Sequence, residues 1–124
     1  MIPHAVYMTE GIVRLIVSGP LALADYRRLT EEALQLARSK NVELFLVDDQ
    51  QTKNRASTLE LFSLPAMYEE LGVPRSSKVA IVVAQDTRFE PDLRFFETVC
   101  VNRGWNVRVF TAERQAIEWL LVKK

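Results

Sequence analysis

Residues 43–49 read Glu-Leu-Phe-Leu-Val-Asp-Asp, an apolar run from Leu44 to Val47 that gives way abruptly to two carboxylates. An apolar run without polar alternation is typical of a strand that is covered on both faces, in the middle of a mainly parallel sheet. The two aspartates would mark the carboxyl end of this strand, where open α/β sheets place their binding sites. We therefore predict that residues 43–49 form the central strand of the fold.

The composition is that of an ordinary globular protein, and we predict a single domain over residues 1–124. The 16 basic and 16 acidic side chains cancel, so no net field would recruit nucleic acid or an anionic membrane. No apolar run approaches the roughly 20 residues that span a bilayer, and the N-terminus lacks the features of a signal peptide. The single cysteine, Cys100, excludes an intramolecular disulfide bond. We expect a cytoplasmic protein with no nucleic-acid partner and no membrane insertion.

The pattern of apolar and polar residues predicts four further strands. Residues 3–9 and 12–17 indicate an antiparallel hairpin, in which Gly11 supplies the positive φ of a tight turn. Residues 78–84 are apolar on both faces, as in the central strand. Residues 105–110 alternate strictly, which is typical of a half-exposed edge strand. The sequence thus predicts a mixed sheet of five strands.

Apolar residues at three- and four-residue steps predict helices in the segments between and after these strands. The first helix is expected over residues 22–39. A proline inside the second helical segment predicts a kink or two short helices, 58–63 and 65–71. Another helix is expected over residues 91–103, and a last one follows Thr111, whose hydroxyl is expected to cap it.

The predicted order of elements is therefore ββαβαβαβα, an α/β fold. Parallel crossovers are right-handed, so if successive strands are neighbours every helix should lie on the same face of the sheet. Arg14 and Arg108, on the second and fifth strands, fit an opposite face that is partly open to water. On that face the central strands would present a bare apolar patch, which we predict as a surface for a protein partner or a second copy of the chain.

A hairpin followed by alternating helices and strands resembles the SpoIIAA-like or STAS fold of anti-sigma-factor antagonists, whose core CRAL-TRIO lipid-transfer domains share. Residues 102–104, 109–111 and 116–120 (Asn-Arg-Gly, Val-Phe-Thr and Ala-Ile-Glu-Trp-Leu) are similar to small bacterial SpoIIAA-like proteins. Residues 19–21 (Gly-Pro-Leu) and 46–48 (Leu-Val-Asp) agree with this resemblance. It implies the SpoIIAA-like fold, with four helices mainly on one face, and a non-enzymatic regulatory or protein-interaction role.

In phospho-switched members of the STAS group, a partner kinase phosphorylates a serine at the start of the helix after the central strand. The matching residue here is Ser57, with Thr58 beside it, and a phosphate at a helix N-terminus would be stabilised by the helix dipole. The Asp-Ser-Gly type signature of the group is absent. The alternative is a plain helix cap, because Ser57 and Glu60 have the spacing of a capping box. With Asp48 and Asp49, these hydroxyls make up a candidate phospho-acceptor or partner loop.

An enzyme is the less favoured alternative. Asp48, Asp49 and Asp86 end neighbouring predicted strands, and carboxylates in such a group suit Mg²⁺. No strand ends in the lysine of a receiver-like site, and His4 has no serine–carboxylate pair near it in the sequence. Cys100 falls in the inward stripe of its helix and is predicted to be a small buried hydrophobe. We therefore predict no catalytic residue, no metal and no cofactor.

A small apolar, lipid-like ligand in a pocket between helices and sheet is the alternative function that the resemblance to lipid-binding relatives implies. Three aromatic residues are candidates for a ligand site or an interface: Phe62, Tyr68 and Phe95. Phe95 is a candidate because its neighbour Phe96 is predicted to face inward, so the side chain of Phe95 should point partly outward. We expect the protein to form a homodimer.

Overall fold

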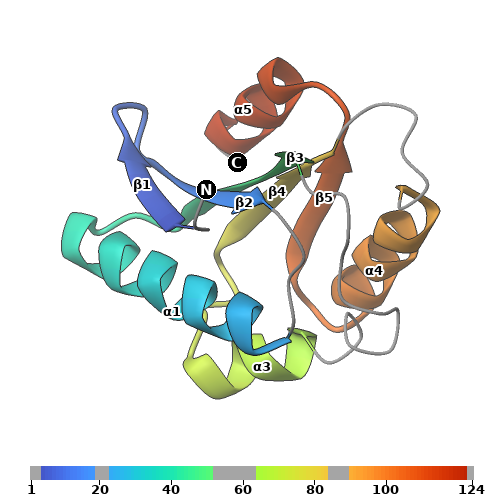
Figure 1. The fold of residues 1–124 in the computed structure, drawn as a ribbon, viewed down its shortest axis with the longest axis horizontal. Coiled ribbons are helices and arrows are strands. Elements are labelled where there is room, and N and C mark those ends of the chain that lie inside the picture. Colours follow the sequence, from blue (N-terminus) through green and yellow to red (C-terminus); the bar gives the residue numbers. More distant parts are fainter. Residues whose placement is uncertain (1–3, 19–22, 52–63, 84–89, 123–124) are drawn as a thin grey trace.

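The computed structural model describes residues 4–18, 23–51, 64–83 and 90–122. Its strands are β1 (His4–Met8), β2 (Ile12–Ser18), β3 (Leu44–Gln51), β4 (Lys78–Val82) and β5 (Asn106–Phe110). They form one sheet in the order β1-β2-β3-β4-β5, so neighbours in sequence are neighbours in space (Figure 1). β1 is antiparallel to β2, and every other neighbouring pair is parallel. The predicted mixed sheet with an antiparallel edge strand is confirmed.

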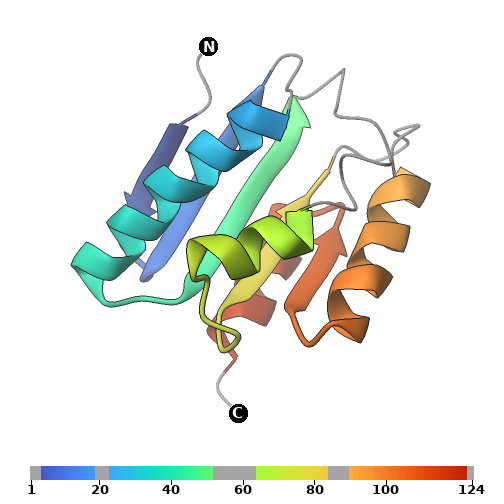
Figure 2. The same cartoon turned by 90° about the horizontal axis from the view of Figure 1, so that it is seen from below.

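The helices of the described residues are α1 (Leu23–Lys40), α3 (Leu64–Leu71), α4 (Glu90–Asn102) and α5 (Glu113–Leu121). Figures 1 and 2 show α1, α3 and α4 on one face of the sheet and α5 on the opposite face. The helices thus lie mainly on one face, as the predicted fold class has it. None of these helices is long and apolar enough to cross a membrane.

β3 lies in the middle of the sheet and is covered on both faces, as its apolar run predicts. Phe45 packs against residues of α1 and Leu46 against residues of α5, and both are buried. Successive residues of a strand point to opposite faces, so helices on both sides of the sheet supply this cover.

The larger core lies between the sheet and the three helices α1, α3 and α4. At the interface of α1 with the sheet the buried residues are Val13, Leu15, Val17, Leu29, Ala33, Leu34, Ala37 and Phe45. At the interface of α3 and α4 with the sheet the buried residues are Met67, Ile81, Val83, Phe96, Cys100, Trp105, Val107 and Val109. The predicted burial of Cys100 is confirmed, since its side chain is fully enclosed.

α5 covers the other face over β3, β4 and β5, where a bare apolar patch was expected. The buried residues there are Ile12, Leu46, Ala80, Val82, Ala116 and Leu120. The prediction that every helix shares one face is therefore wrong for α5, and so is the bare patch over the central strands. The crossover rule fixes only a helix that connects two parallel strands, and α5 follows the last strand. Burial of the apolar side chains of β3 and β4 favours the face that α5 takes.

Two cations of the sheet hold the ends of α5. The Nη2 atom of Arg14 lies 2.8 Å from Oε1 of Glu113, in the first turn of the helix. The Nζ atom of Lys78 donates hydrogen bonds to the carbonyl oxygens of Trp119 (2.9 Å) and Val122 (3.0 Å). Carbonyl groups at a helix C-terminus lack helical partners, and a cation there also interacts favourably with the helix dipole.

Side chains of α1 and α4 block part of both edges of the sheet. On β1, the backbone N–H of Ala5 donates to Oε1 of Glu32 at 2.8 Å. On β5, the N–H of Val109 donates to Oε1 of Glu97, and the Val109 carbonyl accepts from Nη1 of Arg94, both at 2.9 Å. Unpaired backbone groups at a sheet edge are templates for another chain, so these contacts oppose association through the edges.

The ends of the helices agree with the sequence at two positions and differ at a third. Asn41 (φ 57°) and Gly104 (φ 89°) take the left-handed conformation that ends a helix. At the start of α5 the N-cap residue is Ala112, which makes no side-chain capping bond. The predicted Thr111 cap is wrong, because the helix starts at Glu113, one residue later than the cap requires.

α3 begins at Leu64, so Pro65 falls in its first turn. A proline there costs no helical hydrogen bond, because the first amides of a helix have no partner. The predicted helix over residues 65–71 is confirmed, whereas the one over residues 58–63 lies outside the described residues.

Replacing Leu46 by Ala should lower the free energy of unfolding by about 3 kcal/mol, because the change empties a fully buried site between β3 and α5. Urea unfolding followed by circular dichroism measures the loss. Leu121→Ala is the matched control, since Leu121 is 43% exposed on α5, and it should cost less than about 1 kcal/mol. Equal losses for the two variants would contradict the burial of β3 on the α5 side.

Candidate functional site

Asp48 belongs to an ion-pair network that links β2, β3 and α5. Its Oδ2 atom lies 2.8 Å from Nη1 of Arg14, and Nη2 of the same arginine reaches Glu113. The side chains of Arg14 and Asp48 are 17% and 19% exposed, so salt screens this pair less than an exposed one. The network holds α5 on the sheet and gives Asp48 a cationic partner.

The predicted acidic group at the strand ends is only partly described. Asp86 lies outside the described residues, and so does the side chain of Asp49. Within the described part of the chain, no three His, Cys, Asp or Glu side chains are grouped so as to hold a metal ion. The described residues therefore do not test the less favoured alternative, a magnesium site formed by Asp48, Asp49 and Asp86.

The other sequence-predicted site residues fall in different places. Ser57, Thr58 and Phe62 lie outside the described residues. Tyr68, on α3, lines a cavity, whereas Phe95, on α4, is 58% exposed and does not line it. The structure therefore separates Tyr68 from Phe95, which the sequence placed in one group.

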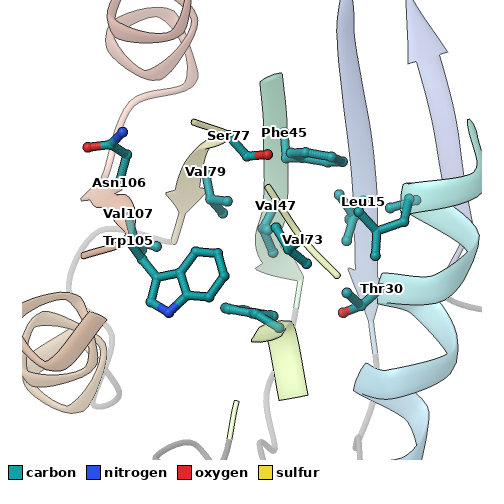
Figure 3. Close-up of a pocket in the computed structure, with 13 residues that line it drawn as sticks. Leu15, Thr30, Phe45, Val47, Val73, Ser77, Val79, Trp105, Asn106 and Val107 are labelled. Atoms are coloured by element: carbon teal, nitrogen blue, oxygen red, sulfur yellow. The ribbon is translucent and has the colours of Figure 1, made fainter. Parts of the chain in front are cut away.

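The cavity lies between the sheet and the helices α1 and α3. Its volume is about 40 Å³, within a hollow of about 490 Å³ that includes the opening to solvent. Its walls are mainly apolar and include Leu15, Ala33, Leu34, Phe45, Val47, Val73, Val79 and Val107 (Figure 3). Ser77 just before β4, together with Trp105 and Asn106 at the start of β5, places part of the wall at the amino ends of these strands. The sequence instead predicted a site at the carboxyl ends of the strands.

Ser77 is a buried polar residue in the wall of this cavity. Its side chain is 2% exposed, and its Oγ atom has no hydrogen-bond partner among the described residues. Its backbone N–H, by contrast, donates to the Pro74 carbonyl oxygen at 3.0 Å. Figure 3 shows the hydroxyl turned towards Phe45. A buried hydroxyl without a partner costs about 1–3 kcal/mol, so Ser77 is the residue of this region that most requires an explanation.

Two aromatic rings from different elements form another part of the wall. Tyr68 and Trp105 meet edge to face, with ring centroids 5.8 Å apart and an interplanar angle of 77°. The guanidinium carbon of Arg75 lies 4.1 Å from the centroid of the Trp105 ring. Burial raises the pKa of the Tyr68 hydroxyl above its ordinary value, so this side chain is neutral at physiological pH.

Cys100 has the properties of a structural residue. Burial raises the pKa of its thiol to about 12, although the charge of Arg103 acts in the opposite direction. Because the thiolate is the nucleophilic form of cysteine, this residue is unreactive at neutral pH.

Sequence reasoning did not identify Ser77. It follows Ser76 in the segment Pro-Arg-Ser-Ser-Lys, which reads as a polar turn, and only packing against the sheet distinguishes the two serines. The Ser76 hydroxyl donates to the Glu43 carboxylate, and its Oγ atom lies 2.9 Å from both carboxylate oxygens. No signal in the residue types separates this exposed serine from the buried one.

Comparison with known proteins identifies the fold. No protein-family model matches the chain, and no curated protein matches it in sequence. An anti-sigma factor antagonist from Mycobacterium paratuberculosis has a similar structure, with a TM-score of 0.61 and 14% identity over 95% of this chain and 92% of that chain. An uncharacterised protein with a SpoIIAA-like fold from Shewanella loihica gives a TM-score of 0.60 and 18% identity over 95% and 91%. The chain has a SpoIIAA-like fold. The fold that the sequence resemblance implied is thereby confirmed.

Arg14→Met should lower the free energy of unfolding by about 2 kcal/mol, because it removes the cation that pairs with both the partly buried Asp48 and Glu113. Thermal and urea unfolding measure the loss. Arg28→Met removes an exposed pair with Asp25 and should cost less than about 0.5 kcal/mol. A loss for Arg14→Met no larger than that of Arg28→Met would show that the network does not stabilise the fold.

Ser77→Ala should raise the free energy of unfolding by about 1 kcal/mol, because it removes a buried hydroxyl that has no described partner. The control is Ser76→Ala, which removes a bonded hydroxyl and should lower stability slightly. Both variants are compared with the parent protein by urea unfolding. A clear loss of stability in Ser77→Ala would mean that the hydroxyl is bonded in the folded protein.

Proposed function

We propose that the protein is a non-enzymatic regulatory module that acts by binding another protein. The observation that carries this proposal is the similarity to the Mycobacterium paratuberculosis anti-sigma factor antagonist, which extends over 95% of this chain and 92% of that one. The match is not confined to a few elements, since it covers nearly the whole of both chains. The shared element is therefore the whole SpoIIAA-like unit.

The helical surface is the part of the described structure that best supports a partner site. α5 covers the central strands on one face, and side chains block part of both sheet edges. α4 exposes two large apolar side chains, Phe95 (58%) and Val101 (54%), and the C-terminal end of α5 exposes Leu121 (43%) and Val122 (59%). Exposed apolar groups favour protein contact when the partner buries them. In this proposal Phe95 contributes to the interface, with a partner protein or with a second copy of the chain in a homodimer.

Phe95→Ser should weaken the complex at least about tenfold without lowering the stability of the fold, because the residue is exposed in the free protein. A partner recovered from extracts of the source cells would be purified and titrated by calorimetry, and light scattering on the purified chain would report a homodimer. Val101→Ser tests whether the effect is confined to Phe95. A monomer that forms no defined complex with any purified candidate would contradict the proposal.

A second candidate function, the binding of a small apolar molecule between helices and sheet, is supported by the cavity beneath α1 and α3. Tyr68, which the sequence singled out for such a site, lies in its wall. Native mass spectrometry of the purified protein would detect a retained molecule as added mass, and solvent extraction would release it. If the gently isolated protein has only the mass of the bare chain, this result would count against a tightly held ligand.

A further inference from the structure

The cavity between α1, α3 and the sheet is small for an apolar ligand. Its volume is about 40 Å³. One water molecule requires about 10–15 Å³, so this space is that of about three water molecules. A larger molecule could enter only if one of the walls moved outward.

α3 is the wall that is held least firmly. α1 packs closely on β1 and β2, and the strands are hydrogen-bonded to one another. α3 has eight residues and approaches the sheet less closely than α1, α4 or α5. Figure 2 shows it in front of the sheet, beside α1. An element with few packing contacts opens at a lower free-energy cost than the rest of a fold.

Two polar contacts tie α3 to α1. The Nη2 atom of Arg27 lies 3.0 Å from Oε1 of Glu70. The Nη2 atom of Arg38 donates to the carbonyl oxygen of Leu71 at 3.5 Å. Along α1 the two arginines flank residues 30–34, the part of this helix that lines the cavity. The contacts therefore hold α3 against α1 on both sides of that wall.

Both contacts are weak enough to open. The side chains of Arg27 and Glu70 are 42% and 64% exposed, and water and salt weaken an exposed ion pair. A donor–acceptor distance of 3.5 Å is at the long limit of a hydrogen bond. α3 is followed by Gly72, which has a φ of 80°. A glycine at the end of a helix can absorb the change in backbone angles when the helix moves.

We propose that α3 is a movable flap over the cavity and that the Arg27–Glu70 ion pair is the latch that favours its closed position. Separation of α3 from α1 enlarges the cavity and admits a neutral apolar molecule. The described residues of the wall include no Lys, Arg, His, Asp or Glu, so an ionised ligand would lose its hydration without gaining a counter-ion. The inference rests on the second candidate function above and adds the movement that this function requires.

Benzene is a suitable probe, since it is apolar and larger than the closed cavity. It is titrated into the ¹⁵N-labelled full chain, and NMR shifts of Val73, Val79 and the Trp105 indole give the dissociation constant. Glu70→Arg places two cations together and should raise the affinity for benzene about threefold, because it increases the population of the open form. Arg27→Glu combined with Glu70→Arg restores a pair of opposite charges and should return the affinity to that of the parent chain.

Arg28→Glu is the matched control. It reverses a charge on the same helix, but Arg28 pairs with Asp25 and not with α3, so the affinity for benzene should not change. NMR relaxation dispersion of the α3 amides reports the movement without a ligand, and its amplitude should increase in Glu70→Arg alone. Circular dichroism verifies folding, and Arg27→Met repeats the test if Glu70→Arg fails to fold.

The possible outcomes separate this inference from the function on which it rests. A gain of benzene affinity in Glu70→Arg that the charge-swapped chain reverses supports the proposal. An affinity that Glu70→Arg leaves unchanged, or a gain that the charge-swapped chain keeps, overturns it. The absence of shifts in every variant up to the solubility of benzene overturns it as well. The second candidate function is judged separately, by the retained molecule that native mass spectrometry detects.

Discussion

The need to cover β3 on both faces governs the arrangement of the helices. Phe45 and Leu46 point to opposite sides of the sheet and both are buried. The right-handed connections place α1, α3 and α4 on the side of Phe45. Among the described elements only α5 is left to cover Leu46, and the sheet supplies Arg14 and Lys78 as the charged groups that fix its two ends.

The two sides of the sheet are packed differently as a result. On the α5 side, one helix covers the central strands, and the open positions beside it carry ion pairs such as Arg14 with Asp48. On the other side, three helices share the cover (Figure 2). A cavity remains between α1, α3 and the sheet. The short side chains of Ala33 and Val79 line the cavity that remains there. A candidate binding site and a candidate protein surface thus lie on the same three-helix side.

The sequence predicted those features that depend on local pattern. Apolar runs and alternation located the strands, and Asn41 and Gly104 marked helix ends because few other residues accept a left-handed conformation. The side on which α5 packs was not predictable in this way, because no crossover constrains a helix after the last strand. The predicted Thr111 cap is wrong because the helix starts one residue later than such a cap requires.

The candidate site shows the same division. Asp48 was identified from its position in the strand, but its partner Arg14 is distant in sequence and is placed beside it only by strand pairing. Tyr68 was selected as an aromatic residue and does line the cavity. The importance of Ser77 depends on burial, which three-dimensional packing decides and which its polar neighbours in sequence conceal. Buried polar groups in turns are therefore the class of site residue that pattern reasoning misses here.

α5 covers the apolar side chains of Leu46, Ala80 and Val82 on one face of the sheet. A partly folded chain in which α5 is undocked would expose these side chains to water. Exposed apolar strands of this kind favour aggregation. Docking of α5 therefore protects the sheet from self-association as well as stabilising the fold.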